Sequence, residues 1–315
     1  MKTSSVTPED LAGSVIAVPP LCLDGAGHID RQENLRLLSH LQSGGITTFM
    51  YGGNANFYNI DRGTLEVFLD FAESLPFPDA WIIPSAGPDF GRLTDHAALF
   101  RDSRFPTVMV LPMAAISTSA GAASGIRRFA ERIVKPIVLY IKREGYIDVP
   151  HVRKLVDDGL VCGIKYAIVR DEPGADDYLT HLVSEVDRKL IVSGIGERPV
   201  IAHWRNFSLT AFTSGSCCVA PALSTEILQA LRREDWAAAE SLRGLFLPFE
   251  DLRDGINPIR VLHDGVRLAG IADTGPLSPM LSNLEEAQAA QVAPAAQALL
   301  AANAGLAAPV ESRLA

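Results

Sequence analysis

The sequence predicts an α/β fold, a (β/α)8 TIM barrel with a C-terminal helical extension. Short apolar runs rich in β-forming residues alternate with helical patterns from residue 14 to about residue 235, which is typical of a parallel sheet covered by helices. There are eight such runs, and this number favours a closed barrel over an open doubly wound sheet. From about residue 222 the chain is helical without strands. We therefore expect a barrel over residues 10–235 and an extension over residues 236–315.

The expected strands are almost wholly apolar, and they lie at residues 14–21, 46–52, 80–86, 107–111, 136–140, 160–168, 189–194 and 208–214. Several of the helices between them have clear boundary signals. One begins at Asp30 and ends at Gly44–Gly45, a second begins at Asp61, and another spans residues 148–159. Aspartate caps helix N-termini and glycine ends helices, so these positions predict the helix boundaries. The turn GIGERP at 194–199 has proline where a dinucleotide-binding motif has its third glycine, which argues against a nucleotide-binding sheet.

Composition excludes several classes of function. The 315-residue chain has a net charge of −9, which argues against nucleic acid and anionic membranes as partners. No apolar run reaches the ~18 residues of a transmembrane helix, and the first residues lack the pattern of a signal peptide. The four cysteines have no zinc-ligand spacing, and the seven histidines show no ligand cluster. We expect a cytoplasmic protein that uses neither a metal nor a cofactor.

A lysine interrupts the apolar run LVCGIKYAIV at 160–169. Side chains alternate along a strand, so Val161, Gly163 and Lys165 share one face. If that face points into a barrel, small Gly163 leaves room beneath the stem of Lys165. Burial then lowers the pKa of the lysine and leaves a neutral amine that can attack a ketone. A lysine on the open face of an edge strand is the ordinary structural alternative.

Two further candidates follow neighbouring strands at the same end of the predicted barrel, where the working residues of such barrels lie. Tyr140 ends the fifth strand, and its hydroxyl is suited to moving protons. The stretch YGGNAN at 51–56 follows the second strand, and its consecutive glycines present backbone N–H groups to a carboxylate. Taken singly, each of these two features is better explained by structure, Tyr140 as a core tyrosine and the glycine-rich stretch as a simple loop turn. Their common position with Lys165 favours a site.

These segments resemble the dihydrodipicolinate synthase/N-acetylneuraminate lyase family of class I, Schiff-base-forming barrel enzymes, over about residues 10–240. The stretch GGNANFYNI lies where that family has GTTGEFYSL, IVLYIKREGYI lies at its tyrosine strand, and GIKYA lies at its G-x-K-(E/D)-(A/S) run. The resemblance implies that Lys165 forms the Schiff base and that Tyr140 shuttles protons. It also implies that Gly53 and Asn54 hold the substrate carboxylate in place of two threonines.

The remaining site residues are expected on the same basis. Arg143 would meet a distal hydroxyl or carboxylate, and the loop Ser193–Gly194 would line the far side of the pocket. Gly53 has no hydroxyl, and the family's second tyrosine is absent from LPMAAIS at 111–117. These departures place the chain nearest to relatives that are aldolases or dehydratases of 2-keto-3-deoxy sugar acids.

The resulting expectation is a Schiff-base lyase, an aldolase or a dehydratase, that acts on pyruvate or a longer 2-keto acid. Two alternatives remain, a 4-hydroxy-tetrahydrodipicolinate synthase and a catalytically inactive barrel that binds a keto acid. A metal-dependent aldolase is set aside because the sequence has no His/Asp/Glu constellation. Members of the resembled family are commonly homotetramers, so a homo-oligomer, a tetramer or a dimer, is expected.

Overall fold

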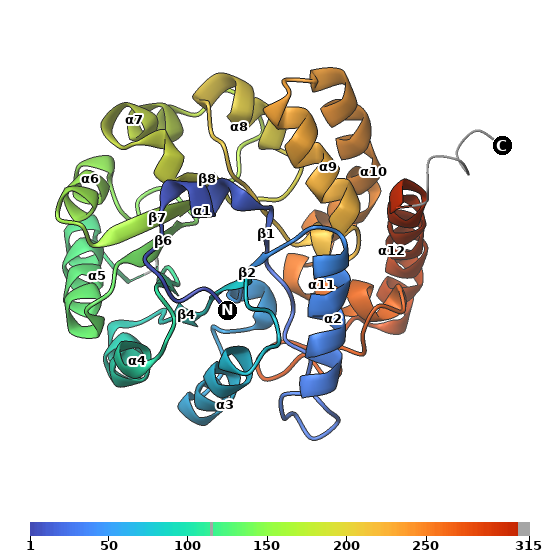
Figure 1. Ribbon diagram of the computed structural model, residues 1–315, viewed down its shortest axis with the longest axis horizontal. Helices are drawn as coiled ribbons and strands as arrows, with labels where there is room; N and C mark the ends of the chain where they lie inside the picture. The colour runs from blue at the N-terminus through green and yellow to red at the C-terminus, as the bar shows by residue number, and fades with distance from the viewer. Residues whose placement is uncertain (114–115, 308–315) are drawn as a thin grey trace.

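The computed structural model describes residues 1–113 and 116–307, and these form a closed ring of parallel strands surrounded by helices (Figure 1). The nine strand segments are β1 (Ile16–Ala17), β2 (Thr48–Met50), β3 (Trp81–Ile83), β4 (Ser85–Ala86), β5 (Val108–Val110), β6 (Ile137–Ile141), β7 (Val161–Tyr166), β8 (Ile191–Ser193) and β9 (Thr213–Ser214). Only Pro84 separates β3 from β4, so the two segments occupy one strand position of the barrel. Eight strand positions result, and each segment begins within its predicted range.

The strand order closes the barrel. One sheet runs β3-β2-β1-β9 and the other runs β4-β5-β6-β7-β8. The two sheets are joined through the strand formed by β3 and β4, and a parallel bridge between Ser193 and Phe212 connects β8 to the approach of β9. All strand pairs are parallel. The (β/α)8 fold class predicted from the sequence is therefore confirmed.

The barrel helices are α2 (Arg31–Ser43), α3 (Arg62–Glu73), α4 (Phe90–Asp102), α5 (Ser119–Ile133), α6 (Val149–Asp157), α7 (Asp177–Glu185), α8 (Val200–Phe207) and α9 (Pro221–Arg232). The predicted aspartate caps are confirmed. The side chain of Asp30 accepts hydrogen bonds from the N–H groups of Gln32 and Glu33 at 3.0 Å. Asp61 caps α3 and Asp148 caps α6 in the same way. These caps satisfy N–H groups that have no partner inside the helix.

A short helix that the sequence pattern did not predict, α1 (Pro8–Gly13), precedes the first strand. Figure 1 shows it in front of β7 and β8, at the N-terminal end of the barrel. Its fully buried Leu11 lies against Gly163, because a Cβ atom added to that glycine would be 3.1 Å from a methyl carbon of Leu11. The room expected beneath Lys165 is thus filled by Leu11. Six residues are too few to give a clear helical period.

The last part of the described chain forms α10 (Trp236–Gly255), α11 (Pro258–Leu268) and α12 (Glu286–Ala307). The helical region expected from about residue 222 thus begins with α9, and Asp235 caps the helix that follows it, α10. Helix α12 packs on α9, α10 and α11. Asn303 of α12 accepts hydrogen bonds from the N–H groups of Ala222 and Leu223, at the start of α9. The boundary between residues 235 and 236 stays a prediction.

Candidate active site

A cavity of about 410 Å³ lies at the carboxyl ends of the strands, where barrel sites are expected. Its walls come from β6, β7, the loops after β2 and β8, and the facing parts of α10 and α11. Of the residues singled out in the sequence, those that line this cavity are Gly53, Asn54, Tyr140, Lys165 and Gly194. The structure thus brings together residues from four separate parts of the sequence.

Lys165 extends from β7 into the cavity, with only 6% of its surface exposed. It pairs in register with Tyr140 of β6, and its Nζ atom lies 4.7 Å from the centre of the Tyr140 ring. Burial lowers the pKa of Lys165 from 10.5 to about 7, and the nearby cations Lys142 and Arg253 add to this effect. Loss of hydration and like charges both disfavour the ammonium form. A large fraction of the amine is therefore neutral near pH 7.

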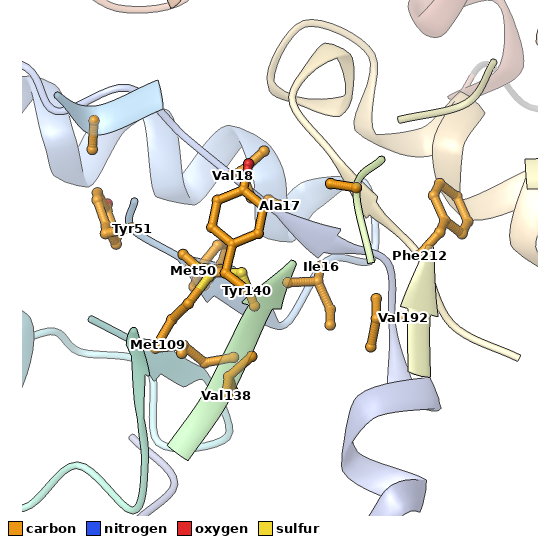
Figure 2. Packing of buried hydrophobic residues seen from close by; sticks show 14 of the residues in the cluster. Ile16, Ala17, Val18, Met50, Tyr51, Met109, Val138, Tyr140, Val192 and Phe212 are labelled. Carbon is orange, nitrogen blue, oxygen red and sulfur yellow. The ribbon is translucent and has the colours of Figure 1, made fainter. Parts of the chain in front are cut away.

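Tyr140 lies on the same strand and face as Val138, and Figure 2 shows its ring among apolar residues of the barrel interior, including Val18 and Met50. Burial raises the pKa of its phenol well above the usual value. The hydroxyl therefore stays protonated at neutral pH and can donate a proton to a neighbouring oxygen or carbon. Strand alternation explains this placement, because Val138, Tyr140 and Lys142 all point toward the barrel axis or its mouth.

The loop after β2 forms a short 3-10 turn, η1 (Gly53–Ala55). Asn54 lies at the cavity wall, and its Nδ2 atom donates a hydrogen bond of 3.1 Å to the carbonyl of Val18. One N–H of the amide remains for a ligand. A Cβ atom at Gly52 would lie 2.5 Å from the Cε atom of Met109, so a larger residue before the turn would have to displace the end of that methionine side chain. The N–H groups at the start of such a turn have no partner within it.

Gly194 lies directly beside the stem of Lys165. Its N–H donates a 2.6 Å hydrogen bond to the carbonyl of Tyr166. A Cβ atom at this position would be 2.9 Å from the Cγ atom of Lys165 and 2.6 Å from that carbonyl. Since no real side chain has such contacts, the absence of a side chain at Gly194 keeps the lysine in place.

Two expected site residues do not line the cavity. Ser193 is fully buried, and its Oγ atom lies 2.8 Å from Nδ1 of His203 on α8. Its side chain therefore faces the helix layer, while the next residue faces the cavity. Arg143 is exposed and is not part of the cavity wall. The alternation that points Tyr140 inward brings Lys142 to the cavity mouth and turns Arg143 away.

The sequence interpretation missed two residues on α10. Glu250 lines the cavity with 3% of its surface exposed, and its Oε1 atom accepts a 3.3 Å hydrogen bond from the N–H of Glu197. Burial raises the pKa of both carboxyl groups, and the charge of Glu197 raises that of Glu250 further. Ser224 donates a hydrogen bond to Glu197. Glu197 thus has donors that favour its charged form, while Glu250 holds the proton at neutral pH.

Arg253, one turn further along α10, also reaches the cavity. Its Nη1 atom donates a 3.0 Å hydrogen bond to Oγ of Ser216, and its Nε atom lies 3.4 Å from the carbonyl of Pro258. The nearby Arg198 is neutralised, because Asp251 and Asp254 lie 2.6 and 3.3 Å from its guanidinium. The sequence around Arg253 carries no recognisable motif. Only the folded position of α10 over the barrel places it at the site.

Within the described residues, no three His, Cys, Asp or Glu side chains come together as a metal site would require. Among the helices of residues 1–113 and 116–307, none is both long and apolar enough to cross a membrane. The stretch 111–117, which lacks the second tyrosine of the resembled family, includes residues 114–115, which lie outside the described residues.

No family sequence model matches the chain, and no curated protein matches it in sequence. Solved structures match its fold closely. The dihydrodipicolinate synthase of Bacillus clausii has a TM-score of 0.81 at 20% identity, covering 92% of this chain and 98% of that one. YagE, a prophage protein of the dihydrodipicolinic acid synthase family from E. coli K12, solved in complex with pyruvate, has a TM-score of 0.80 at 17% identity, with coverages of 91% and 98%.

A third similar structure is PhdJ bound to a substrate intermediate, with a TM-score of 0.79 at 18% identity, covering 97% of this chain and 99% of that one. Each of the three matches covers more than nine-tenths of both chains. The chain therefore has the fold of the dihydrodipicolinate synthases.

Proposed function

We propose that the protein is a class I lyase of the dihydrodipicolinate synthase family, which forms a Schiff base between Lys165 and a 2-keto acid. The observation that carries this proposal is the environment of the lysine. Its amine is buried at the mouth of a barrel, has a pKa of about 7, and lies 4.7 Å from the ring of a protonated tyrosine. Burying a lysine that has no ligand to bind would only destabilise the folded protein, because a buried charge without a partner costs free energy. The similar fold of YagE, solved with pyruvate, supports a small keto acid as substrate.

The reaction begins when the neutral amine of Lys165 attacks the C2 carbonyl. The carbonyl oxygen takes up two protons, one from the amine nitrogen and one from an acid in the cavity, and leaves as water, which gives an iminium. This cation withdraws electrons from C3. In cleavage, the C4 hydroxyl loses its proton as the C3–C4 bond breaks, which gives a carbonyl product and an enamine, and C3 of the enamine then takes up a proton to restore an iminium. In dehydration, a proton leaves C3, and the C4 hydroxyl takes up a proton and leaves as water, which gives a conjugated iminium. Hydrolysis of the iminium returns the free lysine.

Tyr140 is suited to both proton transfers because its hydroxyl is neutral and lies in the same cavity as the amine. The carboxylate of the substrate would meet the first N–H groups of the turn at Gly53 and the free amide N–H of Asn54. This arrangement lacks the threonine hydroxyls of the resembled family, which disfavours a 4-hydroxy-tetrahydrodipicolinate synthase. A 2-keto-3-deoxy sugar acid, cleaved or dehydrated, fits the remaining groups better. The homo-oligomer and the cytoplasmic location stay predictions.

Exchange of the methyl protons of pyruvate for deuterium in D2O tests this proposal, because exchange requires the enamine. Proton NMR should show exchange with the wild-type protein and none with Lys165→Ala. Lys189→Ala, which removes an exposed lysine outside the cavity, is the matched control and should exchange at the wild-type rate. If the wild-type protein exchanges neither pyruvate nor a longer 2-keto acid, the barrel is a binding protein and the lyase proposal is wrong.

A further inference from the structure

Two of the three guanidinium nitrogens of Arg253 have hydrogen-bond partners in the described part of the chain, and the third has none there. Its hydrogen bonds to Ser216 and Pro258 engage Nη1 and Nε, while Nη2 has no acceptor among the described residues. No Asp or Glu of the described chain forms an ion pair with it. A guanidinium is always charged in proteins. A positioned cation that faces a cavity without a counter-charge indicates an anionic ligand.

The free end of Arg253 lies beside the amide of Asn54. The two groups converge over Gly215, where an added Cβ atom would be 2.7 Å from Nη2 of Arg253 and 3.0 Å from Nδ2 of Asn54. Gly215, which follows β9, therefore leaves the space that both donors share. The strand order places β9, β1 and β2 side by side, so these donors form one wall of the cavity.

The surroundings keep this wall positive. Glu250, one turn before Arg253, holds its proton because burial and the charge of Glu197 both raise its pKa. The N-terminus of α11 also faces the cavity through Asn257, Pro258 and Ile259, and a helix N-terminus favours negative charge. Its first N–H groups are occupied by Oδ1 of Asn257, at 3.0 Å from the nitrogens of Ile259 and Arg260. An anion at this wall is therefore held by side chains rather than by the backbone of α11.

We infer that Arg253 and Asn54 together bind the C1 carboxylate of the 2-keto acid, and that Arg253 supplies the charge-assisted hydrogen bond that Gly53, without a hydroxyl, does not supply. This inference rests on the proposed function and adds a binding residue from outside the eight-strand barrel. The pairing of a guanidinium with an amide gives a planar carboxylate up to two donors from one side of the cavity. It also accounts for substrate selection, since a ketone without a carboxylate leaves the cation unpaired.

The test compares pyruvate with pyruvamide, which has the same shape without the charge. Borohydride trapping of each on Lys165 is measured over a range of ligand concentrations, in the wild-type protein, in Arg253→Gln and in Arg253→Lys. We expect Arg253→Gln to raise the half-saturating concentration of pyruvate by about tenfold or more relative to any change in that of pyruvamide. The half-saturating pyruvate concentration of Arg253→Lys should lie between those of the wild-type protein and Arg253→Gln, because a lysine keeps the positive charge but lacks the paired N–H donors of a guanidinium. Arg233→Gln, an exposed residue paired with Glu226, controls for net charge.

The ratio of the half-saturating concentrations of pyruvate and pyruvamide isolates the contribution of the carboxylate contact. Removing Arg253 also raises the pKa of Lys165, but this slows trapping of both ligands alike and cancels in the ratio. Equal shifts for pyruvate and pyruvamide, or no shift for either, would overturn the inference. If the wild-type protein is not trapped at all, the proposed function fails. Ligand-observed NMR of pyruvate with Lys165→Ala, with and without Arg253→Gln, then still decides whether Arg253 binds the carboxylate.

Discussion

The pKa of Lys165 can be measured without any substrate. Lowering it from 10.5 to about 7 corresponds to about 4.8 kcal/mol in favour of the neutral amine, at about 1.36 kcal/mol per unit. Near pH 7, about half of the molecules would carry a neutral amine, compared with about one in 3,000 for an unperturbed lysine. Burial is the largest cause of this shift, so it should be present in the free protein.

Competitive labelling with trace acetic anhydride measures this value, because only the neutral amine reacts. Mass spectrometry of the peptide that contains Lys165 follows its reactivity with pH, relative to the exposed Lys189. We expect an inflection near pH 7. Lys142→Gln should move the inflection to higher pH, because it removes one of the two cations that disfavour the charged lysine. Labelling that rises steadily to pH 10 without an inflection near neutrality would refute the electrostatic reasoning.

Three further outcomes are expected. Tyr140→Phe should slow deuterium exchange of pyruvate about 10²-fold or more, the usual contribution of a positioned acid–base group, while imine trapping persists; NMR measures the exchange, and an unchanged rate would remove the tyrosine from the mechanism. In the wild-type protein, the free energy of unfolding should fall as pH rises above 4.5, by up to about 1.4 kcal/mol per pH unit, because Glu250 loses its proton at lower pH in the unfolded state than in the folded state. Urea unfolding at several pH values should show a shallower fall for Glu250→Gln. Parallel curves for the two proteins would argue against the raised pKa of Glu250. Asn303→Ala should cost about 1 kcal/mol, because α9 has no side-chain cap of its own and takes one from α12; an unchanged urea midpoint would show that α12 contributes little there.

The sequence predicted the barrel well because its signals are local. Continuous apolar runs identify strands that are buried on both faces, and Asp30, Asp61 and Asp148 identify helix starts through hydrogen bonds within three residues. The inward direction of Lys165 also follows from a local rule, the alternation along β7.

The missed features depend on contacts between distant segments. The position of Arg253 is set by the packing of α10 on α9 and α11, and its partner Asn54 lies about two hundred residues earlier in the chain. The neighbouring residues Lys142 and Arg143 cannot be told apart from the sequence, and the structure places Lys142 rather than Arg143 at the cavity. The side chain of Ser193 has its hydrogen-bond partner, the buried imidazole of His203, on the helix side. No sequence pattern predicts this contact.

Borohydride reduction in the presence of pyruvate tests the central claim most directly. Peptide mass spectrometry should find a pyruvate-derived adduct on the peptide that contains Lys165, and no adduct in the Lys165→Ala variant. We expect labelling to increase with pH through the neutral range, as the amine loses its proton. An adduct on another lysine, or none with pyruvate and longer 2-keto acids alike, would contradict the assignment of Lys165 as the Schiff-base residue.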